Sequence, residues 1–208
     1  MGNEKIVGLN ARVRDFWQFA LSDLRMDNTR GHLDEFIVAR ALKLADARRE
    51  WDAHDLLYGG ITFEIKSSEY LQSWEQRNVS KIRLTGLKGT RVSSTGVYDP
   101  AGKTYNAMVH VFYTHITREH AKYDKLQLDH WEFDVVPRST LLELNQASIG
   151  LAGVRRLSGG RTPWASLAEA VTAASQREQL DEEVLMSRLF PSTWDQRRRP
   201  DVIPSPIS

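Results

Sequence analysis

A near-continuous apolar run occupies residues 106–117 (NAMVHVFYTHIT), close to the middle of this 208-residue chain. Such a run predicts a strand that is buried on both faces, so other elements have to cover both sides of its sheet. Residues 130–136 (HWEFDVV) have a similar character, and Pro137 ends that strand because proline has no N–H to donate within a sheet. Together the two runs predict the centre of a mixed sheet flanked by helices.

Two shorter strands precede this centre and form a predicted hairpin. Residues 55–58 (DLLY) and 61–67 (ITFEIKS) are separated by Gly59 and Gly60. A Gly-Gly pair is one of the better short-range signals for a two-residue turn, because both turn positions require a positive φ. We therefore expect two antiparallel strands joined by a tight turn.

The hairpin carries ionisable residues in an unusual pattern. Glu64 and Lys66 share strand parity, so both point to one face of the strand while Ile65 points to the other. Asp55 lies on the partner strand, where its carboxylate can face that of Glu64. Ionisable groups on a buried strand need a partner. The alternative interpretation is a surface hairpin on which Glu64 and Lys66 form a solvated pair worth ~0–1 kcal/mol.

These residue types suit a divalent-cation site. Two facing carboxylates repel each other, and a divalent cation relieves the repulsion. Oxygen ligands favour Mg²⁺ or Mn²⁺ over Zn²⁺. Such an ion polarises a phosphoryl oxygen and lowers the pKa of a bound water, and Lys66 can orient that water or stabilise charge on the phosphate. Asp55, Glu64 and Lys66 therefore supply the parts for phosphodiester hydrolysis.

This arrangement resembles the motif of the PD-(D/E)xK phosphodiesterase superfamily, the fold of restriction endonucleases and archaeal Holliday-junction resolvases. Asp55 matches the first acid of the motif, and Glu64-Ile65-Lys66 matches its ExK element, which also lies in a strand after a glycine turn. The resemblance implies an α/β, restriction-endonuclease-like αβββαβ core over about residues 30–140, with a mixed central sheet flanked by helices.

The resemblance also implies an activity, that of a Mg²⁺-dependent nuclease and more narrowly a DNA endonuclease. The ligands that it implies for one or two Mg²⁺ (or Mn²⁺) ions are Glu35, Asp55, Glu64 and the main-chain carbonyl of Ile65. Lys66 would position or activate the attacking water. Gln72, or alternatively Gln76, matches a polar residue on the helix after the lysine, and Gln72 would steady the site or the substrate.

The chain departs from the superfamily pattern at one point. The residue before Asp55 is His54 rather than proline, and Asp52 is a competing candidate for the first acid. The alternative function is a catalytically inactive nucleic-acid-binding or assembly module on the same fold.

Basic residues that follow the hairpin suggest a surface for double-stranded DNA. The candidates for phosphate contacts are Lys81, Arg83, Lys88 and Arg91, with Ser67 and Ser68 as hydrogen-bond donors. Trp74 is close enough in sequence to contact substrate. The alternative for the basic residues is a solvated strand face and loop.

The other expected elements follow from periodicity and turn signals. Helices are predicted over residues 11–25, 32–46, 69–77, 138–147, 162–175 and about 181–190. The first should bury an aromatic stripe, and the first turn of the second should contain Glu35. Strands are predicted at 80–84, next to the site, and at 149–156, at the sheet edge. Residues 86–105 are interpreted as exposed loops, with a short strand near Val97 as an option.

Composition sets limits on class and location. The formal net charge of +1 does not indicate a polyanion-binding protein, so a nucleic-acid surface has to come from local charge segregation. The absence of cysteine excludes disulfides and thiolate sites. With no signal-peptide core and no membrane-length apolar run, we expect a cytoplasmic protein that does not bind membranes. Because cutting both strands commonly uses two active sites, a homodimer is a further expectation.

We expect one nuclease-like domain over residues 1–190. Residues 191–208 contain four prolines and Arg197-Arg198-Arg199. They are predicted to be a disordered tail, and the alternative is a basic arm that adds salt-dependent affinity for nucleic acid.

Overall fold

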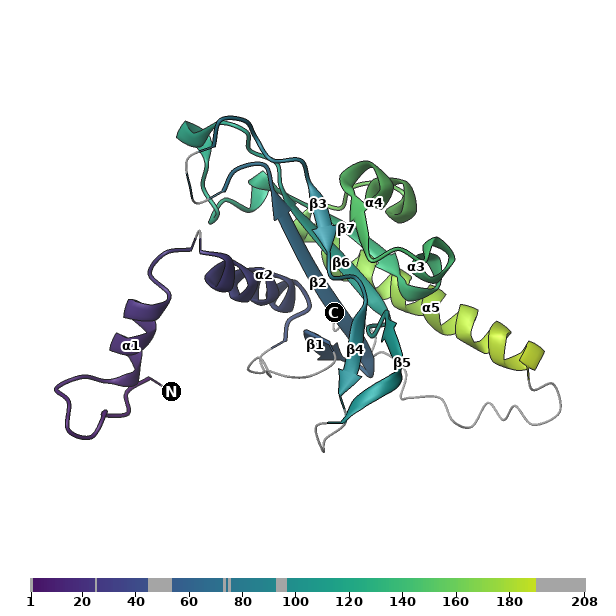
Figure 1. Ribbon diagram of the computed structural model, residues 1–208, viewed down its shortest axis with the longest axis horizontal. Coiled ribbons are helices and arrows are strands. Elements are labelled where there is room, and N and C mark those ends of the chain that lie inside the picture. The colour runs from purple at the N-terminus through teal and green to yellow at the C-terminus, as the bar shows by residue number, and fades with distance from the viewer. Residues whose placement is uncertain are drawn as a thin grey trace.

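The protein has a mixed α/β fold built around an open four-stranded sheet, as the computed structural model shows (Figure 1). The structure describes residues 2–24, 26–44, 54–72, 74, 76–92 and 97–189. The strands, in sheet order, are β1 (Leu56–Tyr58), β2 (Ile61–Glu69), β6 (Val109–His115) and β7 (Trp131–Pro137). β1 is antiparallel to β2, β2 is parallel to β6, and β6 is antiparallel to β7, so the sheet is mixed as expected.

β6 and β7 confirm the burial predicted from their apolar runs, although β7 lies at the edge of the sheet and not at its centre. Every residue of β6 and of β7 is buried. Each face of these strands contributes to a separate hydrophobic cluster, because successive side chains point to opposite sides. The sheet therefore lies between two layers, as a doubly buried strand requires.

The first layer contains α2 (Asp27–Ala41) and α5 (Leu167–Leu189). Their residues Val38 and Val171 pack in one cluster with Phe63, Val111 and Phe133 of the sheet. The buried alternate residues of β2 belong to this face.

The opposite layer contains α3 (Arg138–Leu144) and α4 (Leu151–Ser158). Leu141 and Val154 of these helices pack with Phe112 and Val136 of the sheet, together with Leu84.

Two small antiparallel ribbons complete this second layer, and they correct two predictions. β3 (Arg83–Thr85) pairs with β8 (Ser148–Gly150), and β4 (Gly89–Val92) pairs with β5 (Tyr98–Thr104). The strand predicted at 80–84 is thus shifted and lies outside the main sheet, because its buried residues Ile82 and Leu84 face the core from a separate ribbon. The stretch predicted as loops contains both strands of the second ribbon.

The segment after β2 differs from the predicted helix over 69–77. Glu69 is the last residue of β2, and the described residues from Tyr70 to Ser80 contain bends but no helix. The cause is the fully buried Glu69 carboxylate, whose partners lie on other elements and hold residue 69 in the strand. The described part of the connection from β2 to β6 consequently contains β3, β4 and β5 and no helix.

The first helix, α1 (Val13–Ala20), corrects the expected buried aromatic stripe. None of its residues is buried, and Phe19 is 84% exposed. Figure 1 shows α1 standing apart from the sheet at the N-terminal end of the chain. The amphipathic periodicity correctly predicted a helix, but it does not specify what the apolar face packs against.

Several boundaries also differ from prediction. α2 begins five residues before His32, so Glu35 lies in its third turn rather than its first. The predicted strand at 149–156 is the short β8 followed by α4, with Gly150 at the junction. The two helices predicted after residue 162 form the single helix α5. The predicted tail at 191–208 lies outside the described residues.

Candidate active site

The turn of the β1–β2 hairpin sets the register between β1, which follows Asp55, and β2, which carries Glu64 and Lys66. Gly59 and Gly60 have φ values of 55° and 80°, the left-handed conformation that glycine adopts without steric cost. The turn fixes the register in which Leu56 is opposite Phe63. The paired register ends at Leu56, and beyond it the Asp55 N–H donates to the Phe63 carbonyl at 2.8 Å, so Asp55 lies alongside β2 at the start of the hairpin.

The Asp55 carboxylate is tied to the ExK strand itself. Its Oδ2 accepts a hydrogen bond of 2.7 Å from the main-chain N–H of Ile65. Asp55 therefore lies beside the residue that separates Glu64 from Lys66. Asp52, the competing first acid, lies outside the described residues.

Glu64 and Lys66 form an ion pair along the same face of β2. Both side chains are half-buried, with exposures of 18% and 27%. The segment before β4 lies over Lys66, since a Cβ added at Gly86 would be 3.9 Å from Lys66 Cε. The pair thus occupies a partly enclosed position instead of the freely solvated surface of the alternative interpretation.

The surrounding carboxylates alter the protonation of Glu64. Burial raises its pKa, and the negative charges of Asp55 and Glu35 raise it further against the opposing effect of Lys66. Glu35, half-buried on α2, has the smallest of these effects on the pKa of Glu64.

Lys66 remains charged at neutral pH. Burial lowers its pKa, but the charges of Glu64, Asp55 and Glu35 outweigh burial and give a net raised pKa. A lysine in this state acts as a cation that positions or stabilises an anion, and it is a poor proton acceptor.

The donor chemistry of the group fits Mg²⁺ or Mn²⁺, since Asp55, Glu64 and Glu35 supply only oxygen and their mutual repulsion raises the pKa of Glu64. The side chains are not gathered as a ligand set, however. Among the described residues, no three His, Cys, Asp or Glu side chains form a group that could hold a metal ion. Glu64 is instead paired with Lys66, and Asp55 with the Ile65 N–H.

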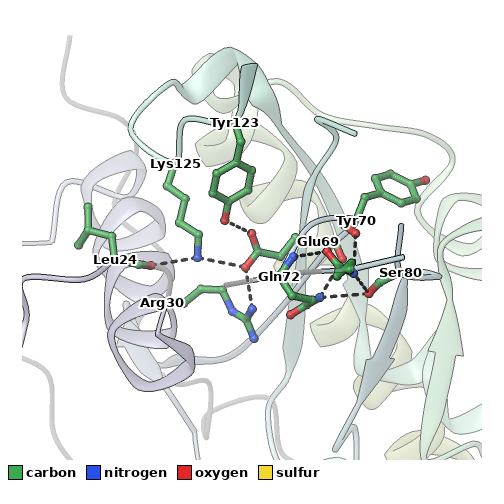
Figure 2. A network of polar contacts seen from close by, with 9 residues as sticks. Leu24, Arg30, Glu69, Tyr70, Gln72, Ser80, Tyr123 and Lys125 are labelled. Carbon is green, nitrogen blue, oxygen red and sulfur yellow. Dashed lines mark hydrogen bonds and ion pairs between the residues drawn. The ribbon is translucent and has the colours of Figure 1, made fainter. Parts of the chain in front are cut away.

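Gln72 and Gln76 lie beyond the far end of β2 and form structural contacts there. Gln72 Nε2 donates to Ser80 Oγ at 3.4 Å and to the Glu69 carbonyl at 3.3 Å (Figure 2). Gln76 Nε2 donates to the same Ser80 oxygen at 2.9 Å, and Gln76 Oε1 accepts from the Gln72 N–H at 2.7 Å. Trp74, between them, is 58% exposed.

The other predicted contact residues fall into two groups. Ser67 has the parity of Ile65, so it faces α2, whereas Ser68 has the parity of Lys66. Lys81, Arg83, Lys88 and Arg91 follow one another along the β3–β4 segment, at exposed or half-buried positions.

His110 adjoins the site, although no local feature of the sequence indicated this position. It is opposite Glu64 in the parallel β2–β6 pair and is 1% exposed. Neither of its ring nitrogens has a hydrogen-bond partner. Burial lowers the His110 pKa to about 3, with smaller effects of Lys66 and Arg138, so this imidazole is neutral at ordinary pH. Only the strand register, which the sequence does not encode locally, brings His110 and Glu64 together.

A second buried ionic group lies on the opposite face of β2 and was not predicted (Figure 2). The Glu69 carboxylate contacts Arg30 at 2.6 Å and Lys125 at 3.0 Å, and it accepts a 2.5 Å hydrogen bond from the Tyr123 hydroxyl. Lys125 also donates to the Leu24 carbonyl at 3.0 Å. These contacts connect α2 to the end of the strand that carries Glu64 and Lys66.

Comparisons with known proteins provide no relative for this chain. No family model matches it, no curated protein matches it, and no solved structure matches it. None of the helices in the described part of the chain has the length and apolar character needed to cross a membrane.

Proposed function

We propose that the protein is a metal-dependent nuclease that hydrolyses phosphodiester bonds, with double-stranded DNA as its substrate. One observation carries this proposal: the Asp55 carboxylate accepts a hydrogen bond from the Ile65 N–H, between Glu64 and the ion-paired Lys66, and the charge of Glu35 acts on the same two residues. If Glu64 and Lys66 were only a structural surface pair, the charges of three acids would not need to act on one half-buried lysine.

The same proposal extends to the fold. The helix that carries Glu35, the Gly-Gly hairpin, and the parallel strand β6 follow the order of a restriction-endonuclease-like core. The absence of a described helix between β2 and β6, and the position of β3 outside the main sheet, are departures from that core.

In this mechanism Asp55, Glu64, Glu35 and the Ile65 carbonyl would hold the ion. A bound Mg²⁺ would polarise the phosphoryl oxygen and lower the pKa of a water molecule. Lys66, being charged, orients the attacking water through its lone pairs and stabilises negative charge that develops on the phosphate. To bind the ion, Glu64 has to give up its ion pair with Lys66. The Lys66 ammonium is then available to the substrate.

The test is cleavage of supercoiled plasmid DNA with Mg²⁺ and with EDTA. The wild-type protein should nick or linearise the plasmid only with Mg²⁺, and Lys66→Met should abolish cleavage while the circular dichroism spectrum is unchanged. Lys122→Met is the matched control, because Lys122 is an exposed lysine that also pairs with a glutamate, Glu119. Full activity of Lys66→Met would exclude the mechanism.

The second candidate is an inactive nucleic-acid-binding module on the same fold. The observation in its favour is that Glu64 is occupied by Lys66 and the acids form no ligand group among the described residues. Metal-independent DNA binding by the wild-type protein, without cleavage in Mg²⁺ or Mn²⁺, would identify this candidate.

A further inference from the structure

The β3–β4 segment carries three cations that are held by neutral oxygen atoms. Arg83 Nη2 donates to Ser148 Oγ at 2.7 Å. Lys88 Nζ donates to Asn145 Oδ1 at 2.5 Å and to the Asn145 carbonyl at 3.3 Å. The third contact joins Arg91 Nε to Asn106 Oδ1 at 3.2 Å.

These cations differ from other basic residues of the protein. Arg30, Arg138 and Arg155 are each paired with a buried glutamate: Glu69, Glu178 and Glu132, respectively. Within the described ranges, no ion pair joins Arg83, Lys88 or Arg91 to an acid. Because an amide or hydroxyl oxygen fixes a cation without cancelling its charge, all three keep their full attraction for an anion.

Two of the neutral partners belong to regular elements of the fold or end one of them. Asn145 has φ 52° and ends α3, and the neighbouring Gln146 carbonyl accepts a 2.6 Å hydrogen bond from the buried Tyr105 hydroxyl. Ser148 is in β8, whose pairing with β3 fixes it relative to Arg83. Lys88 also lies over the Tyr105 ring, with Nζ 5.2 Å from the centroid. Pre-positioning of this kind reduces the entropy that ordering long side chains would otherwise cost on binding.

The segment that carries these cations adjoins the candidate active site. Gly86, between Arg83 and Lys88 in the sequence, is the residue whose added Cβ would lie 3.9 Å from Lys66 Cε.

We propose that Arg83, Lys88 and Arg91 form a track for the sugar–phosphate backbone of double-stranded DNA. Asn106, Asn145 and Ser148 are positioning residues that hold the track without neutralising it. Three cations held on one segment contact the phosphates of one strand, and phosphate contacts carry no base information, so binding through the track is independent of sequence. This inference rests on the proposed function, whose site the track serves.

The track is tested by replacing its anchor asparagines with aspartate, so that a carboxylate neutralises the bound cation. Asn145→Asp and Asn106→Asp change only the charge of the anchor, and each places a carboxylate against its cation. Binding of a double-stranded oligonucleotide is measured against salt concentration, without metal and in the Lys66→Met background, so that cleavage does not enter the result. Asn10→Asp, at an exposed asparagine on the N-terminal segment, is the matched control.

The track predicts weaker binding in both anchor variants and a salt slope that is smaller by ~0.9 for each lost phosphate contact. Lys88→Gln and Arg91→Ala should reproduce these changes without altering an anchor, and Asn10→Asp should match the parent. Two unrelated oligonucleotide sequences should bind equally.

Unchanged binding and slope in all four track variants would overturn the track, as would failure of the parent to bind DNA. Neither result depends on cleavage, which is measured separately in the plasmid assay. Absence of Mg²⁺-dependent cleavage, with binding that still weakens in Asn145→Asp, would overturn the nuclease proposal and support the track.

Discussion

The carboxylate of Asp55 accepts a 2.7 Å hydrogen bond from the main-chain N–H of Ile65, ten residues further along the chain. Ile65 is the middle residue of the Glu64-Ile65-Lys66 segment, and its side chain is buried in the opposite direction. The bond connects the residue before β1 to the centre of β2 and keeps the first acid next to the other two charges. The charged group therefore depends on the geometry of the hairpin as well as on the spacing of its residues in the sequence.

The first prediction concerns the protonation of Glu64. Asp55→Asn removes a negative charge that raises the Glu64 pKa, so this pKa should fall. Lys66→Met removes the cation that opposes the rise, so the Glu64 pKa should increase. Carboxyl-detected NMR titration measures both directions. A Glu64 pKa that is the same in the wild-type protein and both variants would show that the three groups do not interact.

The second prediction concerns the Glu69 ionic group. Glu69→Gln leaves Arg30 and Lys125 beside a neutral amide, and Lys125 is only 3% exposed, so the free energy of unfolding should fall by about 3–5 kcal/mol. Glu119→Gln, which breaks an exposed pair with Lys122, should cost about 0.2–1 kcal/mol at most. Urea unfolding at pH 7 compares the two. Equal, small losses would mean that the buried group does not stabilise the attachment of α2.

The third prediction concerns Asp34, on α2 beside the same group. Burial raises its pKa from 3.8 to about 7, although Ser67 and the charges of Lys125 and Arg30 oppose the rise. The folded state therefore binds a proton more tightly than the unfolded state, and the stability contribution of Asp34 falls as pH rises from about 4 to about 7. At about 1.4 kcal/mol per pH unit, the loss is at most about 4 kcal/mol.

Asp34→Asn removes this titrating group. The variant should gain stability relative to the wild-type protein at pH 8 and should show little difference at pH 4, where wild-type Asp34 is protonated when folded. Urea unfolding at several pH values supplies the comparison. A difference between variant and wild type that is constant from pH 4 to pH 8 would contradict the assignment.

The sequence predicted those parts of the fold whose signals are local. The apolar runs of β6 and β7 require burial on both faces wherever they pair, and the Gly59-Gly60 turn requires its own conformation. These elements are confirmed. The α/β class and the mixed sheet follow from them.

The errors share a physical cause, which is that long-range contacts outweigh local propensity. Glu69 stays in β2 because Arg30, Tyr123 and Lys125 surround its carboxylate, and no local signal distinguishes that from a helix start. Phe19 remains exposed because α1 lies apart from the sheet. The strand register that places His110 opposite Glu64 is likewise a property of the assembled sheet.

The residues of the candidate site likewise divide into those that local sequence predicts and those that depend on long-range packing. The parity of Glu64 and Lys66 and the hairpin that brings Asp55 to them could be predicted from adjacent residues. The resemblance indicated Glu35, but its distance from the hairpin depends on how α2 packs. The neutral anchors of Arg83, Lys88 and Arg91 come from residues 106–148 and could not be read from the motif.

The central claim is that the hairpin acids hold a divalent cation beside a charged lysine. Anomalous scattering from a crystal soaked in Mn²⁺ tests it most directly. The account predicts a Mn²⁺ peak between the carboxylates of Asp55 and Glu64, with Glu64 released from Lys66, and loss of the peak in Glu64→Gln. A peak-free hairpin at saturating Mn²⁺, with the Glu64–Lys66 ion pair intact, would contradict it.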